Sequence, residues 1–263
     1  MKKKLVTARL RLMGLIGILA AFNTSLARSE PIDCQHKSST QKKAECLQKA
    51  KSQYIEVGII ILPSTKVAQE TQKLTAEISK ELKERISHQP LSYKNIPHIS
   101  LYQGKIERKN LSAVQKRLKQ IAADTQPFSI QLQHTLSNAG DSIYWNANLD
   151  KNLEQLHNRV VDEFSLFTKG LRMRQVEDMP ENALNVSQKN KLEKYGIFWI
   201  KESFTPHLTI FYNAKAYPAL YSIVRQVRPD TSATGFEIKN LAVAELGYEG
   251  NVEKILAVYE TGS

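Results

Sequence analysis

The sequence predicts an α+β fold of two pseudo-symmetric lobes, in which antiparallel sheets with outer helices surround a central cleft. The first supporting observation is that the pattern Pro-His-aliphatic-hydroxyl-aliphatic occurs twice, at Pro97–Leu101 and Pro206–Ile210. The second is that a helix and two strands are predicted after each copy at nearly the same spacing. Phe128 lies 30 positions after the first histidine, and Phe236 lies 29 positions after the second. Such an internal repeat places the two histidines at equivalent positions of two lobes.

The composition is that of a folded protein. Of 263 residues, 41% are hydrophobic and 24% are charged, which is enough for one large domain or two lobes and excludes a disordered chain. The formal net charge is +11, but residues 1–27 contain five basic residues and no acidic ones, so the remainder carries +6. A moderately basic chain is compatible with a polyanionic ligand but does not demand one.

The first 27 residues have the pattern of a signal peptide. Five basic residues lie between Lys2 and Arg11, an apolar stretch too short to span a bilayer comfortably covers Gly14–Phe22, and small residues follow at Ser25–Ala27. We therefore expect cleavage after Ala27, a periplasmic or secreted mature chain, and no stable membrane association once the signal is removed. The alternative is an uncleaved membrane anchor.

Residues 28–53 form a polar, Lys-rich segment before the main domain, which is predicted over 54–263. This segment holds the only two cysteines, Cys34 and Cys46, and a short helix is expected around Thr40–Lys51. Because export implies an oxidising compartment, we expect a Cys34–Cys46 disulfide. Two cysteines alone do not make a metal site.

Periodicity places the elements around the first motif. Tyr54–Leu62 is β-branched and apolar, which predicts a buried strand. Ser64 or Thr65 can cap the helix that follows, in which apolar residues recur at helical spacing. The first histidine strand is predicted near 98–103 and is expected to end near Gly104.

Capping and turn residues delimit the elements of the middle region. Asn110 can cap the next helix, Pro127 opens a strand, and a further strand follows Asp141. Asp150 can then cap another helix, and Gly170 is placed to stop it.

The stretch 171–194 is polar and weakly periodic, so it is interpreted as a loop insertion. Such a loop is either a binding lid or a solvated surface excursion. The second histidine strand is predicted near 205–212 and is followed by a helix from Tyr217. Two further strands are predicted, around 235–245 and 252–259.

Each motif presents a histidine and a hydroxyl on one face of its strand. Alternate side chains of a strand point to opposite faces, so His98 and Ser100 can point to one cleft, as can His207 and Thr209. The aliphatic residues between them can point into a core. Two such strands brought together supply two imidazoles and two hydroxyls, a minimal metal-free apparatus for acid–base chemistry on a phosphate ester.

The motifs His98-Ile99-Ser100-Leu101 and His207-Leu208-Thr209-Ile210, with Gly104 after the first, resemble the signature of the two-histidine (2H) phosphoesterase superfamily. That group includes RNA 2′,5′-ligases, cyclic nucleotide phosphodiesterases and RNA-trimming exonucleases. The similarity covers roughly Ile55–Tyr259, and the signal peptide and the insertion depart from it. The resemblance implies a phosphodiesterase with a nucleotide or RNA-type phosphodiester substrate and no cofactor.

The resemblance also assigns roles to the four motif residues. His98 and His207 would act as general acid and general base, in an order that the sequence does not decide. Ser100 and Thr209 would donate hydrogen bonds to the non-bridging phosphate oxygens. A zinc site needs three or four protein ligands, and the sequence near the motifs offers no third one, so we expect no metal. The alternative is that both histidines are structural residues at strand ends.

Several other residues are candidates for the cleft. Tyr102 and Phe211 each lie four residues after a motif histidine, where they could stack on nucleobases or pack the floor of the cleft. Tyr144 is a further cleft candidate. Basic residues near strand ends that could attract phosphate are Lys105, Lys201 and Lys215. The histidines without such context, which are interpreted as structural or exposed, are His36, His88, His134 and His157.

The leading hypothesis is an exported, monomeric phosphoesterase that hydrolyses a cyclic phosphate, a 2′,5′-linked oligonucleotide or an RNA-end phosphodiester. One alternative is a non-catalytic module of the same fold that binds a nucleotide or RNA. Another is an exported protein that contacts a host or partner through the 171–194 insertion. Intact histidine and hydroxyl pairs favour the enzyme, because binding alone does not need both acid–base groups.

Overall fold

The strands form two groups that meet at the histidine strands. The computed structural model describes residues 53–85, 95–139, 142–177, 179–212, 217–247 and 250–262. Its strands are β1 (Tyr54–Ile61), β2 (Ile99–Glu107), β3 (Ser129–Gln131), β4 (Ser137–Ala139), β5 (Ser142–Asn146), β6 (His207–Tyr212), β7 (Gly235–Glu237), β8 (Asn240–Leu246) and β9 (Val252–Glu260). A seven-stranded antiparallel sheet has the order β4-β5-β6-β2-β1-β8-β9, and β3 pairs separately with β7.

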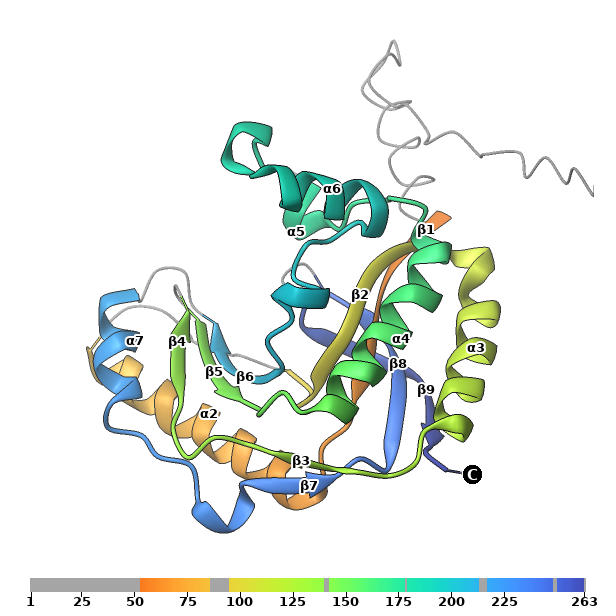
Figure 1. Cartoon of the computed structure of the whole chain (residues 1–263). Coiled ribbons are helices and arrows are strands. Elements are labelled where there is room, and N and C mark those ends of the chain that lie inside the picture. Colours follow the sequence, from red (N-terminus) through yellow and green to blue (C-terminus); the bar gives the residue numbers. More distant parts are fainter. Residues whose placement is uncertain are drawn as a thin grey trace, which may run out of the picture.

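The sheet divides into two lobes where β2 meets β6. These two histidine strands share one registered pair, Ile99 with Leu208. The sheet therefore consists of a three-stranded lobe (β4, β5 and β6) and a four-stranded lobe (β2, β1, β8 and β9), which diverge from this contact (Figure 1). The predicted α+β class with antiparallel pairing is confirmed. The structure joins the strands of both lobes into one sheet.

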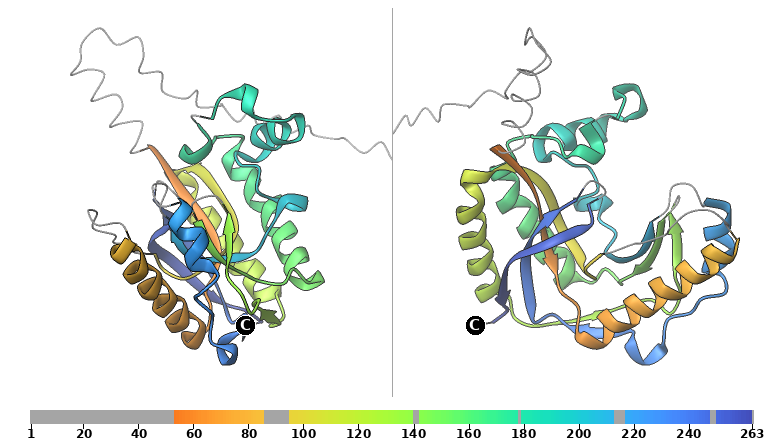
Figure 2. Two further views of the ribbon diagram at one scale, coloured as in Figure 1. Left: turned by 90° about the vertical axis from the view of Figure 1, so that its left-hand side faces the viewer. Right: turned by 180° about the vertical axis from the view of Figure 1, so that it is seen from behind.

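Helices cover the outer faces of both lobes. The helices of the described residues are α2 (Thr65–Arg85), α3 (Leu111–Asp124), α4 (Lys151–Thr168), α5 (Arg174–Glu177), α6 (Val186–Tyr195) and α7 (Tyr217–Val224), with short 3-10 turns η1 (Arg108–Asn110), η2 (Glu181–Ala183), η3 (Lys201–Ser203) and η4 (Thr231–Ala233). Helices α3 and α4 pack on the four-stranded lobe, and α2 and α7 pack on the three-stranded lobe (Figure 2).

The repeat predicted from the spacing has a crossed arrangement in space. Helix α3 follows the first histidine strand and contacts β8 and β9, which come from the second half of the chain. Helix α7 follows the second histidine strand and contacts β4 and β5, which come from the first half. Each half thus supplies a helix that covers strands of the other, and the β3–β7 pair also joins the two halves.

Local sequence explains why the main helices lie where they do. In α2, the residues Val67, Leu74, Ile78 and Leu82 are fully buried on one face, as their helical spacing predicts. The Asp150 side chain accepts a hydrogen bond from the Leu153 N–H at 2.8 Å and caps α4. Helix α4 ends where Lys169 and Gly170 adopt left-handed φ values of 47° and 76°.

Three expectations about individual elements are wrong. Gly104 does not end the first histidine strand, because β2 continues to Glu107. Glycine is required there for space, since a Cβ would lie 2.5 Å from the Thr168 Cγ2 of α4. Asn110 is the N-cap residue of α3, but its side chain makes no capping hydrogen bond.

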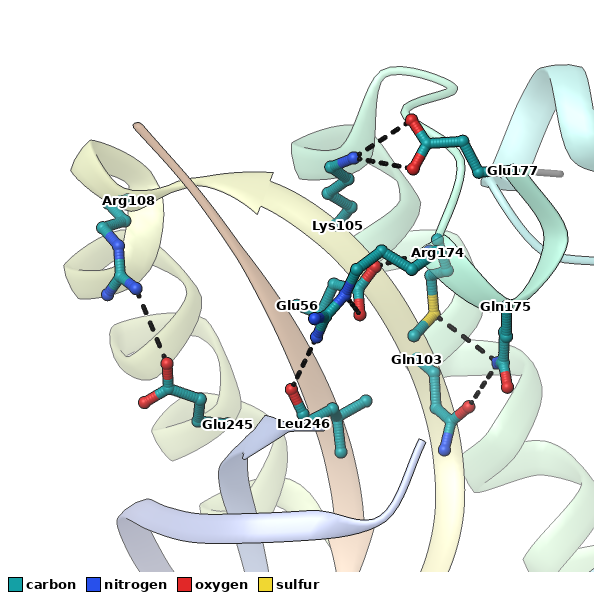
Figure 3. A network of polar contacts seen from close by, with 10 residues as sticks. Glu56, Gln103, Lys105, Arg108, Arg174, Gln175, Glu177, Glu245 and Leu246 are labelled. Carbon is teal, nitrogen blue, oxygen red and sulfur yellow. Dashed lines mark hydrogen bonds and ion pairs between the residues drawn. The ribbon is translucent and has the colours of Figure 1, made fainter. Parts of the chain in front are cut away.

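The third wrong expectation is that 171–194 is a loop. This stretch contains α5, η2 and all but the last residue of α6, and α6 begins with a capping box in which Asn185 and Gln188 bond reciprocally. The stretch is tied to the sheet by Arg174, whose backbone N–H and Nε donate to the Glu56 carboxylate at 2.6 and 2.9 Å (Figure 3). That carboxylate is 5% exposed, so its guanidinium partner compensates a buried charge.

The predicted signal peptide (1–27), the segment up to residue 52 and the cysteines Cys34 and Cys46 lie outside the described residues. The same holds for Lys215, His36 and His88. No helix within the described ranges has the length and apolar character needed to cross a membrane.

Candidate active site

A cavity of about 760 Å³ lies between the lobes and collects all four motif residues. His98, Ser100, His207 and Thr209 line it together. The sequence prediction that the two motifs face one cleft is therefore correct. The remaining lining comes mainly from the segment 197–205 that leads into β6, from β5 and from further residues of β2, and the 171–194 stretch adds Gln175 and Met179.

Both histidines are held by the same local hydrogen bond. The Nδ1 atom of His98 lies 2.6 Å from the Ile96 carbonyl oxygen, and that of His207 lies 2.7 Å from the Thr205 carbonyl oxygen. A carbonyl only accepts, so in each neutral ring Nδ1 carries the proton and Nε2 is the basic nitrogen. The bond partner is two residues upstream in both motifs, and the intervening proline fixes the backbone between them.

Burial favours the neutral form of both imidazoles. The pKa of His98 is lowered to about 4, because desolvation and, to a lesser extent, the nearby His207 lower it while the Ile96 bond raises it. Desolvation also lowers the pKa of His207, while its bond to Thr205 raises it. Because charge on one ring disfavours charge on the other, a single proton shared between the two rings is preferred over two.

The cleft-facing positions change parity after each hydroxyl. In the pairing of β2 with β1, Ser100 and Tyr102 pair with two adjacent residues of β1. Leu101, which lies between them, is therefore the extra residue of a β-bulge. In the pairing of β6 with β5, Thr209 and Phe211 pair with two adjacent residues of β5, so Ile210 is the extra residue of a second bulge. Such a bulge reverses the in–out alternation beyond it.

The bulges determine whether the two aromatic candidates, Tyr102 and Phe211, face the cavity. Phe211 is 1% exposed and does not line the cavity, so its prediction as a stacking residue is wrong. Tyr102 lines the cavity but is buried, and its hydroxyl donates to the Tyr195 carbonyl oxygen at 2.7 Å. Of the two roles considered for Tyr102, the structure therefore favours packing in the floor of the cleft over stacking on a nucleobase. The residues that face the cavity are instead Gln103 and Tyr212, each five positions after its histidine.

An aromatic group lies against the second histidine. Tyr144, which the sequence named as a cleft candidate, lines the cavity, and its ring centroid is 4.0 Å from that of His207 at an interplanar angle of 30°. Trp199, which sequence reasoning missed, also lines the cavity while remaining 45% exposed. Its position in an irregular segment gave no periodic signal.

The two described lysine candidates are engaged in ion pairs outside the cavity. Lys105 contacts Glu177 at 3.3 Å, Lys201 contacts Asp162 at 2.7 Å, and neither lines the cavity. Among the described residues, no group of three or more His, Cys, Asp or Glu side chains is arranged to hold a metal ion.

The two-lobed α+β fold carries two histidines on adjacent strands, and each is followed by a hydroxyl residue that faces the cavity. These features define a protein of the two-histidine phosphoesterase class. Residues 63–247 match the model of the 2′-5′ RNA ligase superfamily, and the chain belongs to this family.

Solved structures resemble the chain at low sequence identity. E. coli LigT complexed with phosphate is 12% identical, with a TM-score of 0.45, over 80% of this chain and 99% of that chain. Kluyveromyces marxianus Usb1 is 11% identical, with a TM-score of 0.33, over 80% of this chain and 97% of that chain. No curated protein matches.

Proposed function

We propose that this protein is an exported, metal-independent phosphodiesterase that acts on a cyclic phosphate, a 2′,5′-linked oligonucleotide or an RNA-end phosphodiester. Membership of the family supports phosphoesterase-type activity. The observation that carries the proposal is that His98 and His207 both commit Nδ1 to a backbone carbonyl and share one cavity with two hydroxyls. This arrangement leaves two Nε2 atoms for proton transfer.

For a 2′,3′-cyclic phosphate, one neutral histidine takes a proton from water through Nε2 while the water oxygen bonds to phosphorus. The bond from phosphorus to the 2′ or 3′ oxygen breaks, and the other histidine, protonated at Nε2, gives its proton to that leaving oxygen. Ser100 and Thr209 donate hydrogen bonds to the non-bridging oxygens, where charge develops. The anionic substrate favours the protonated ring, which burial disfavours in the free protein.

Aromatic lining supports a substrate that carries a base. Tyr144 stands against His207, and Tyr212 and Trp199 also line the cavity. Stacking on an aromatic face tolerates any nucleobase, so these residues can bind the base while the motif residues hold the phosphate.

The test is hydrolysis of the four nucleoside 2′,3′-cyclic phosphates and a 2′,5′-linked dinucleotide in excess chelator. His98→Ala and His207→Ala should each lower kcat/KM at least about 100-fold. His134→Ala, which changes an exposed histidine, should not alter it. Turnover that survives loss of either motif histidine would reject the mechanism. Nucleotide binding without product would support the non-catalytic binding module.

We also propose that residues 1–27 direct export and that Cys34 and Cys46 pair in the mature chain. Intact mass of the protein from periplasm and medium, with and without thiol alkylation, tests both. A chain that begins at Arg28 and lacks free thiols is expected. A full-length chain retained in membranes would support the uncleaved anchor.

A further inference from the structure

The Ser100 hydroxyl lies in a chain of amide hydrogen bonds that leads to the 171–194 stretch. Gln103 Nε2 donates to Ser100 Oγ at 3.1 Å and to the Gly250 carbonyl oxygen at 3.3 Å. Gln175 Nε2, from α5, donates to Gln103 Oε1 at 3.1 Å (Figure 3). Both glutamines line the cavity beside Ser100.

These contacts fix which end of the Gln103 amide faces Ser100. The Gly250 carbonyl can only accept, so the amide nitrogen of Gln103 must point toward it, and the same nitrogen reaches Ser100. The opposite orientation would bring two oxygens together at Gly250 and two nitrogens together at Gln175. The amide is therefore a donor to Ser100.

A hydroxyl group has one proton and two lone pairs. Because Gln103 donates to the Ser100 oxygen, that interaction does not consume the serine proton, which can be donated elsewhere. We propose that Gln103 and Gln175 are positioning residues that orient the Ser100 O–H toward a non-bridging oxygen of the substrate phosphate. This inference rests on the proposed function and extends it to residues outside the two motifs.

The hydrogen-bonded chain from Gln175 through Gln103 to Ser100, which we call the relay, is anchored to the sheet. Arg174, the neighbour of Gln175, is bonded to the buried Glu56 carboxylate of β1 through both its backbone and its side chain. Figure 3 shows Gln175 and Arg174 extending from the same short helix toward β2 and β1. The second motif is built differently, because the residue equivalent to Gln103 is Tyr212, whose side chain ends in a phenol and not in an amide. The relay thus acts on one of the two hydroxyls.

A double-mutant cycle tests the relay. Gln103→Met is neutral and close in shape, and it removes the donor. We expect it to lower kcat/KM about tenfold, and Ser100→Ala to lower it about 100-fold. In the Ser100→Ala background, Gln103→Met should change kcat/KM less than about twofold, since the hydroxyl it orients is gone. In the matched Thr209→Ala background, the full tenfold loss should persist.

Gln175→Met provides a second variant in case Gln103→Met fails to fold. It leaves the Gln103 nitrogen in place but removes the anchor of its oxygen, so a loss of about threefold is expected, again only where Ser100 is present. Equal losses with and without Ser100, or equal coupling to Thr209, would overturn the relay.

The relay and the proposed activity can fail separately. If the wild-type protein hydrolyses none of the substrates, the same cycle is measured on the Kd of inorganic phosphate by ³¹P NMR titration. Coupling of Gln103 to Ser100 but not to Thr209 in that Kd would retain the relay while rejecting turnover. A wild-type protein that neither turns over substrate nor binds phosphate would overturn both.

Discussion

His157 links the first histidine strand to the segment that leads into the second, and it should make the stability of the protein depend on pH. It lies on α4 and is 1% exposed. Its Nδ1 lies 2.8 Å from the carbonyl oxygen of Leu101, the last residue of the first motif. Its Nε2 accepts from the Lys201 N–H at 2.8 Å, in η3 before the second motif. The ring also stacks on Phe204, with centroids 3.7 Å apart. Protonation at Nε2 would replace the acceptor by a donor that faces the Lys201 N–H.

The magnitude follows from the pKa. Burial lowers the pKa of His157 to about 4 from an ordinary 6.5; the bond to Leu101 raises it, Lys201 lowers it and Asp162 raises it. A group whose pKa is depressed by folding in this way contributes stability that is complete above the unfolded pKa. That contribution is lost as the pH falls from 6.5 toward 4. Between pH 7.5 and pH 5 the loss from His157 is about 2 kcal/mol.

Urea unfolding of the wild type and of His157→Gln at pH 7.5, 6.5, 5.5 and 5.0 measures the pH-dependent contribution of His157 to the free energy of unfolding. The variant should be the less stable protein at pH 7.5, and the difference should shrink by about 2 kcal/mol at pH 5, because glutamine does not titrate. His134→Gln, at an exposed position, should follow the wild type. A difference between wild type and His157→Gln that is the same at every pH would refute the reasoning.

Three further predictions concern activity and packing. Because folding lowers the pKa of both motif histidines, kcat/KM should peak below pH 6.5 and fall about tenfold per pH unit on its alkaline side. A maximum at pH 7 or above would contradict this. Gly104→Ala should cost about 1–3 kcal/mol of unfolding free energy, and Thr168→Ser, which removes the opposing methyl, should restore much of it. An equal cost of Gly104→Ala with Thr168 and with serine at that position would show that the clash is not the cause. Asp150→Ala should cost about 1 kcal/mol in thermal or urea unfolding, whereas Asn110→Ala, which removes no capping bond, should cost clearly less; similar costs would count against the capping assignment.

The sequence alone determined the class of the fold, the repeat and the four motif residues. These features depend on local patterns: alternation along a strand, apolar spacing along a helix, and a motif short enough to stay on one strand face. His98 and Ser100 lie before the bulge in their strand, as do His207 and Thr209 in theirs, so simple alternation placed all four correctly. The Asp150 cap is equally local.

Tertiary structure decided what lies beyond the bulges. A bulge is a property of the pairing between two strands, and the partner strand is not visible in the sequence around Leu101 or Ile210. Alternation therefore assigned Phe211 to the cleft, where the structure places Tyr212. The relay from Gln175 to Gln103 joins residues 72 positions apart, and the Tyr102 hydroxyl bonds a carbonyl 93 positions away. Contacts between such distant segments arise only when the chain packs, because no local pattern records them.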